Sequence, residues 1–117
     1  MNKVNIKRVY EPFEKEDGFR ILVDRLWPRG ISKEKAKADS WLKEIAPSNE
    51  LRKWFNHEPE KWKDFVIKYK KELKNCAAVN ELEELVKAHK NITLLFAARD
   101  TLHNNAVVLK DFIEKKG

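Results

Sequence analysis

The stretch 21–30, ILVDRLWPRG, joins the end of a buried strand to the start of a polar loop. Three consecutive apolar residues come first, and a continuous apolar run is typical of a strand buried on both faces of its sheet. The run stops at the charged pair Asp24 and Arg25, and a tryptophan, a proline, a second arginine and a glycine follow at once. This ending predicts a site at the point where the strand leaves the sheet.

Outward from this stretch, short apolar runs alternate with amphipathic segments. We expect strands near 4–8 and over 19–24 and 92–98. We expect a short helix capped by Ser32, a second capped by Ser48 or Asn49, a third from Pro59 to Leu73, a fourth around 78–86 and a last from Asn104 or Asn105 to Lys116. Trp54 and Trp62 fall on apolar helix faces and are expected in the core.

Buried strands separated by helices predict an α/β fold: a single small layered domain over 1–117 with a mainly parallel sheet flanked by helices. The link between the first two strands is short for a parallel crossover, which needs about 12 residues or more. The first pair is therefore either antiparallel or joined by an unusual link.

Composition limits the class of protein. The 117 residues are 42% hydrophobic and 10% aromatic, which is typical of one globular domain. A single cysteine, Cys76, excludes an internal disulfide, and no apolar run approaches the roughly 20 residues of a membrane span. We expect a cytoplasmic protein with no membrane contact. The net charge of +6 favours small anionic ligands and nucleic acid as partners.

Two predicted strands end in the same pair of residue types. The strand over 19–24 ends at Asp24 and Arg25, and the strand over 92–98 is followed by Arg99 and Asp100. If these strands are parallel neighbours, both pairs meet at the edge of the sheet where α/β proteins bind ligands. The last helix begins just beyond, and its free N–H groups favour an anion. The predicted ligand-binding residues are Asp24, Arg25, Trp27, Arg29, Arg99, Asp100 and Asn104.

Each of these residues also has a purely structural interpretation. Asp24 and Arg99 can form an ion pair that locks the sheet edge, Trp27 can cover the core, and Asn104 can cap the last helix. The candidates for proton transfer are Asp24 and His103. His57 lies in a helix-capping turn and is expected to be structural.

Several kinds of site have no counterpart in the sequence. With three glycines, the chain contains no glycine-rich phosphate loop and no dinucleotide fingerprint, so no cofactor is expected. The three histidines and the cysteine are widely spaced, so no metal site is expected. No nucleophilic serine motif is present, and whether the protein is an enzyme stays open.

Three stretches resemble the YeaO-like, short branch of domain-of-unknown-function family 488: VDRLWPRG (23–30), WLKEIAPSNELRKWFNHEPEKW (41–62) and LLFAARDTLHNNAVVLKDFI (94–113). The resemblance implies a small cytosolic α/β domain and brings no settled function. Compared with the longer branch, this chain keeps Asp24, Arg99 and Asp100. It has Phe96 and Asn104 where cysteines would fall, and Asn105 in place of a histidine, so thiol chemistry is not implied here.

These observations lead to three hypotheses. The first is a small anion-binding or phosphate-binding domain with its site at the carboxyl ends of the strands. The second is a nucleic-acid-binding module that uses the basic surface, with Trp27 as an exposed stacking residue. The third is a structural or interaction domain in which the motif is a packing lock.

Overall fold

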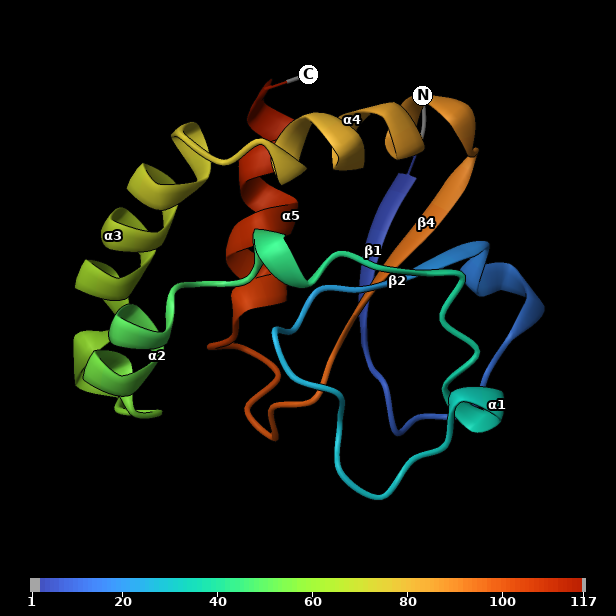
Figure 1. The fold of residues 1–117 in the computed structure, drawn as a ribbon, viewed down its shortest axis with the longest axis horizontal. Coiled ribbons are helices and arrows are strands. Elements are labelled where there is room, and N and C mark those ends of the chain that lie inside the picture. Colours follow the sequence, from blue (N-terminus) through green and yellow to red (C-terminus); the bar gives the residue numbers. More distant parts are fainter. Residues whose placement is uncertain (1–2, 117) are drawn as a thin grey trace.

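The computed structural model describes residues 3–116, which form one parallel sheet and five α-helices (Figure 1). The strands are β1 (Lys3–Arg8), β2 (Phe19–Leu22), β3 (Ser40–Trp41) and β4 (Asn91–Phe96). The helices are α1 (Lys33–Ala36), α2 (Asn49–Phe55), α3 (Trp62–Lys74), α4 (Ala78–Ala88) and α5 (Asn105–Lys116). Single 3₁₀ turns lie at Lys15–Asp17, Lys43–Ile45 and Pro59–Lys61. The predicted α/β class is confirmed.

The sheet has the strand order β1-β4-β2-β3, and every adjacent pair is parallel. An antiparallel first pair is therefore wrong, because β1 pairs with β4 and not with β2. The link 9–18 carries the chain past β4 to β2. Extended residues span about 3.3 Å each, so this link is long enough to return along the short β2 and to cross two strand spacings of about 5 Å. The two-residue β3 was not expected, because so short a strand has no readable periodicity.

Both faces of the sheet are covered, as the apolar runs predicted. Alternate residues of β4, including Leu94 and Phe96, join a main core with residues of α2, α3, α4 and α5. The opposite face carries a smaller second core of Val9, Leu22, Ala36 and Leu95, with Trp27 and Ile31 packed against it. α5 contacts β1, β4 and α3, so it lies between the sheet and the outer helix (Figure 1).

A buried charged cluster closes the second face at the amino end of β2. Arg20 is fully buried, and its guanidinium pairs with the Asp17 carboxylate and donates to the carbonyls of Ala36 and Lys37. Lys7 Nζ lies 3.1 Å from the same carboxylate. Each of the three guanidinium nitrogens of Arg20 therefore has a partner, which is what allows an arginine to be buried inside this layer.

Two features of the helices differ from expectation. The third helix begins at Trp62, because Pro59 opens a 3₁₀ turn before it. Trp54 is 37% exposed instead of buried, and its ring lies beneath the amines of Lys61 and Lys68 at 5.1 and 5.2 Å. Trp62 packs against the main core as predicted.

Among the described residues, no helix has both the length and the apolar character needed to cross a membrane.

Candidate functional site

The carboxyl ends of β2 and β4 open into one cavity. The two strands are neighbours, but the chain leaves β2 towards α1 on the second core and leaves β4 towards α5 on the main core. Connections that depart to opposite faces leave a crevice between adjacent strands, and α/β sheets bind ligands in such a crevice. A cavity of about 760 Å³ lies there, between residues 24–29 after β2 and residues 97–105 after β4.

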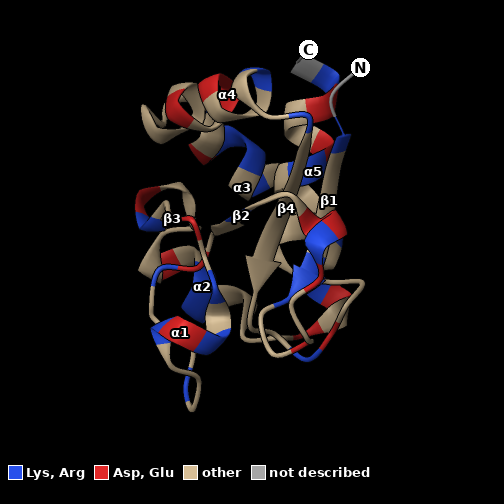
Figure 2. Cartoon of the chain, turned by 90° about the vertical axis from the view of Figure 1, so that its right-hand side faces the viewer, with Lys and Arg blue, Asp and Glu red and all other residues tan. Residues whose placement is uncertain are grey.

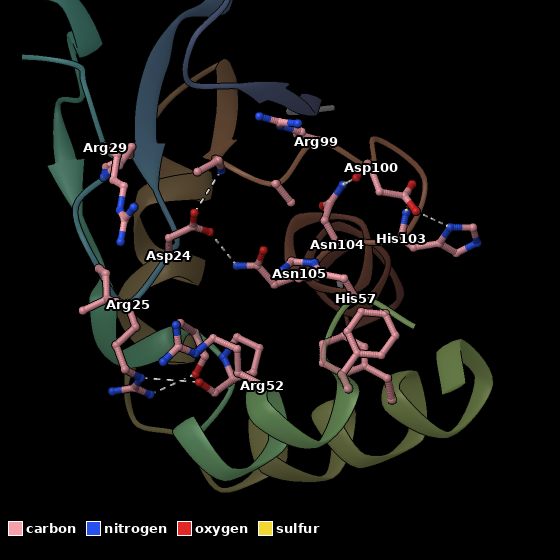
Figure 3. Close-up of a pocket in the computed structure, with 18 of the residues that line it drawn as sticks. Asp24, Arg25, Arg29, Arg52, His57, Arg99, Asp100, His103, Asn104 and Asn105 are labelled. Atoms are coloured by element: carbon pink, nitrogen blue, oxygen red, sulfur yellow. Dashed lines mark hydrogen bonds and ion pairs between the residues drawn. The ribbon is translucent and has the colours of Figure 1, made fainter. Parts of the chain in front are cut away.

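All the residues predicted from the two strand ends line this cavity (Figure 3). They are Asp24, Arg25, Trp27, Arg29, Arg99, Asp100, His103 and Asn104. Sequence reasoning missed the contributions of Tyr10, Arg52, His57 and Asn105 to the lining. The cavity therefore brings four arginines and two aspartates together from segments far apart in the chain.

Asp24 lies half-buried at the centre of this group (Figure 3). Its Oδ2 accepts a hydrogen bond from the Ala97 N–H at 2.9 Å, and its Oδ1 accepts one from Asn105 Nδ2 at 3.1 Å. Burial raises the pKa of the Asp24 carboxyl, although these two hydrogen bonds and the charge of Arg52 act in the opposite direction. Asp24 is thus held by the residue that follows β4 and by the first residue of α5.

The predicted ion pair between Asp24 and Arg99 is absent from the described residues. No nitrogen of Arg99 lies within 4 Å of the Asp24 carboxylate, which turns instead to the main chain of Ala97. The ion pair of the structural interpretation is therefore wrong, and Asp24 is bound instead by Ala97 and Asn105. Residue charges in the sequence suggest an arginine as the partner of Asp24. A main-chain N–H is present at almost every residue, so the sequence does not reveal which one Asp24 binds.

The four arginines of the cavity differ in how far their guanidinium groups are engaged. Arg25 donates to the carbonyls of Ala46 at 3.1 Å and Pro47 at 3.4 Å, so it fastens the loop that follows β3. Arg52 makes one hydrogen bond, at 3.3 Å, to its neighbour Asn49.

Arg29 and Arg99 are both exposed, and within residues 3–116 neither guanidinium has a hydrogen-bond or ion-pair partner. Each guanidinium offers a fork of donors that matches an anionic oxygen pair. These two side chains are therefore the ones available to an anion that enters the cavity.

Asp100 and Asn104 shape the turn that leads into α5. Asp100 accepts hydrogen bonds from the N–H groups of Leu102 and His103, and its second oxygen lies 2.9 Å from His103 Nδ1. The contact with His103 lowers the pKa of the Asp100 carboxyl. Asn104 is buried, and its Oδ1 accepts the Val107 N–H, so it caps α5 as the structural interpretation proposed.

His103 is paired with Asp100, and its ring lies edge-on to Trp62 with 5.0 Å between the ring centroids. Figure 3 shows the imidazole pointing away from Asp24. The two candidates for proton transfer thus line one cavity without facing each other.

The segment 24–31 is fastened along its length by side-chain donors. Trp41 Nε1 donates to the Asp24 carbonyl at 2.7 Å, Tyr10 Oη donates to the Arg29 carbonyl at 2.7 Å, and Trp27 Nε1 donates to the Ile31 carbonyl at 2.8 Å. The ring of Trp27 packs against the second core and lies edge-on to Trp41. Trp27 is therefore half-buried and engaged, and the expectation of an exposed stacking residue is wrong.

His57 enters the cavity wall through the turn that ends α2. Asn56 and His57 both have positive φ angles, 46° and 55°, and two left-handed residues in succession redirect the chain sharply. The Asn-His pair in the sequence is a usable sign of such a turn, because asparagine tolerates this conformation better than most residues. The residue types around this turn gave no indication that the turn borders a cavity.

No three side chains of His, Cys, Asp or Glu within residues 3–116 are grouped so that they could ligate a metal ion.

The fold and the site define a small parallel α/β domain with an arginine-lined cavity at the carboxyl ends of its strands. The chain belongs to the family described as the inactive DUF488-N3 subclade, which matches residues 3–117. The uncharacterised protein YeaO of Escherichia coli is 44% identical over 94% of this chain and 96% of its own length. An uncharacterised protein of Mycobacterium tuberculosis is 40% identical over 95% of this chain and 93% of its own. No solved structure matches the chain.

Proposed function

We propose that this protein binds a small anionic ligand in the cavity at the carboxyl ends of β2 and β4. The ligand class that we favour is a metabolite that carries a phosphate group. The observation that carries the proposal is the state of Arg29 and Arg99. Both residues line the cavity, and neither guanidinium group is paired within the described residues. Arginine forks bind phosphate and carboxylate through charge-assisted, bidentate hydrogen bonds.

The hydrogen bonds that fix the segment 24–31 support the proposal. Trp41, Tyr10 and Trp27 already fix the backbone that carries Arg25 and Arg29. A ligand that binds to a fixed backbone does not have to order that loop first, so less of its interaction energy is lost on binding.

We favour binding over an acyl- or phosphoryl-transfer enzyme. The described residues that line the cavity include no Ser, Thr, Cys or Lys, so a covalent step would have to use one of the Asp, His or Tyr side chains there. The family is itself described as inactive. We keep Asp24 and His103 as the candidates for proton transfer.

The test is isothermal titration with inorganic phosphate at constant ionic strength. We expect saturable binding to the wild type and at least a tenfold weaker association with the double variant Arg29→Ala, Arg99→Ala. The control is Lys63→Ala, Lys71→Ala, which removes the same charge from exposed positions of α3 outside the cavity. Equal affinity of the wild type and the arginine variant would overturn the proposal.

A nucleic-acid-binding module stays the alternative hypothesis. Its support is the net charge of +6, together with exposed Trp54 and the lysines beside it. Basic and acidic residues are mixed on α1 and α4 (Figure 2), whereas a phosphate-tracking surface concentrates one sign of charge. Salt-sensitive gel shifts with single-stranded RNA or DNA, lost in Trp54→Ala, would favour this alternative.

The cytoplasmic location expected from the single cysteine also stays a prediction.

A further inference from the structure

Unused acceptors on the cavity floor carry an inference about the ligand that rests on the proposed anion binding. An ionised carboxylate has about four lone-pair sites. The Asp24 carboxylate accepts two hydrogen bonds from the described residues, one from Ala97 and one from Asn105. Because Asp24 also lines the cavity, its remaining acceptor positions are open to a ligand that donates hydrogen bonds.

Asn105 supplies a second acceptor beside Asp24. Its Nδ2 lies 2.9 Å from the Val23 carbonyl and 3.1 Å from Asp24 Oδ1. Both of these atoms are acceptors, so the amide nitrogen must face them, and the orientation of the amide is fixed by its neighbours. The Oδ1 atom of Asn105 is left as an acceptor next to the carboxylate, in a residue that lines the cavity.

The lining of the cavity carries both signs of charge. An anion placed directly on Asp24 would meet a negative charge, whereas Arg29 and Arg99, which lie on different sides of Asp24 in Figure 3, offer unpaired positive charges. The lining also includes the apolar side chains of Trp27, Pro28 and Phe55, which suit a carbon skeleton. The volume of about 760 Å³ lies within the usual range of about 300–1,000 Å³ for organic ligands, so inorganic phosphate would leave much of it unfilled.

We infer that the ligand is a hydroxylated organic phosphate, with its phosphate on Arg29 and Arg99 and its hydroxyl groups on Asp24 and Asn105. Two neighbouring acceptors suit a diol, which presents two hydroxyl donors on adjacent carbon atoms. A sugar phosphate, a polyol phosphate and a nucleotide share this chemistry. A phosphate ester without hydroxyl groups would leave these half-buried acceptors without a ligand donor and would bind more weakly for that reason.

The experiment is a titration calorimetry comparison of glycerol 3-phosphate with n-propyl phosphate, which has the same chain length and no hydroxyl groups. We expect the wild type to bind glycerol 3-phosphate at least tenfold more tightly. In Asp24→Asn the preference should fall below about threefold, because the amide presents a donor in place of an acceptor, and propyl phosphate should bind no more weakly than before. Arg29→Ala is the matched control and should weaken both ligands by a similar factor.

The outcomes separate this inference from the proposed function. Equal binding of the two esters by the wild type overturns the inference and leaves the anion site intact. This comparison needs no variant, so it stands even if Asp24→Asn fails to fold. Failure of every phosphate to bind overturns both. Ribose 5-phosphate and adenosine 5′-monophosphate identify the source, since tighter binding of the first supports a sugar phosphate and tighter binding of the second supports a nucleotide.

Discussion

Asp17 and Asp24 show how two carboxylates in one small domain are pushed in opposite directions by their surroundings. Burial raises the pKa of Asp24, and two hydrogen bonds are too few to reverse that effect. Burial also acts to raise the pKa of Asp17, but hydrogen bonds from the Glu14 N–H, Lys7 and Arg20 outweigh it, and the pKa is lowered. Asp17 is therefore a structural anion, whereas Asp24 lines the cavity and accepts only two hydrogen bonds from the described residues.

Asp17→Asn is expected to destabilise the fold by about 3–5 kcal/mol at pH 7, because it leaves the Arg20 guanidinium buried without a counter-charge. The lowered pKa of Asp17 means that its stabilisation is fully present above the unfolded value of about 3.9 and is lost as the pH falls through the folded value. Urea unfolding should therefore show the wild type and the variant converging below about pH 4.

The control for this prediction is Asp111→Asn at the surface. Lys70 lies 2.6 Å from Asp111, but both side chains reach solvent, so the loss should stay below about 1 kcal/mol. A cost of Asp17→Asn equal to that of Asp111→Asn, or one that does not change with pH, would contradict the structural role of the buried cluster.

Gly18 and Gly30 form a second matched comparison at the residue scale. Both have positive φ angles, 69° and 74°, which side chains rarely adopt. A Cβ on Gly18 would lie 2.3 Å from the Asn91 carbonyl oxygen, whereas a Cβ on Gly30 would meet nothing within 4 Å. We expect Gly18→Ala to lose about 3 kcal/mol or more and Gly30→Ala about 1 kcal/mol in chemical denaturation. Similar losses of stability at both positions would contradict the close contact between Gly18 and Asn91 of β4.

At the scale of elements, the hydrogen bond by which Tyr10 holds the segment 24–31 can be tested directly. Tyr10→Phe removes the hydroxyl that donates to the Arg29 carbonyl and keeps the ring. We expect a loss of stability of about 1 kcal/mol and a threefold to tenfold weaker affinity for phosphate, because the ligand must then order the loop.

Hydrogen exchange reports the same effect without a ligand. The amides of 25–31 should exchange faster in Tyr10→Phe, and those of α3 should serve as an unchanged reference. Unchanged exchange in 25–31 together with unchanged affinity would mean that the tether does not preorganise the site.

The elements themselves were largely predictable, because each has a local cause. The apolar run of 92–96, the caps at Ser32 and Ser48 and the stripe of Phe65, Tyr69 and Leu73 are short-range patterns, and the structure has the corresponding strand and helices. β3 and the buried Arg20 were not predictable. Their stability comes from partners distant in sequence, such as the pairing of Ser40 with Ile21 and the carbonyl of Lys37.

For the whole molecule, the prediction of the site followed from topology. Two strands that each end in an aspartate and an arginine were expected to meet if they were parallel neighbours, and β2 and β4 are such neighbours. Arg52, His57 and Asn105 were missed as cavity residues, because the packing of α2 and α5 around the strand ends decides which side chains face inward. The two hydrogen bonds to the Asp24 carboxylate come from the Ala97 main chain and from the Asn105 side chain, and both depend on tertiary packing that the sequence does not reveal.

Anion binding at the carboxyl ends of β2 and β4 is tested most directly by titrating the ¹⁵N-labelled protein with inorganic phosphate at constant ionic strength and following its amide resonances by NMR. The account predicts saturable shifts in the amides of 24–30 and 97–105, the segments that line the cavity, and their loss in Arg29→Ala, Arg99→Ala. Shifts that do not saturate, or that lie only along the exposed lysines of α3, would contradict it.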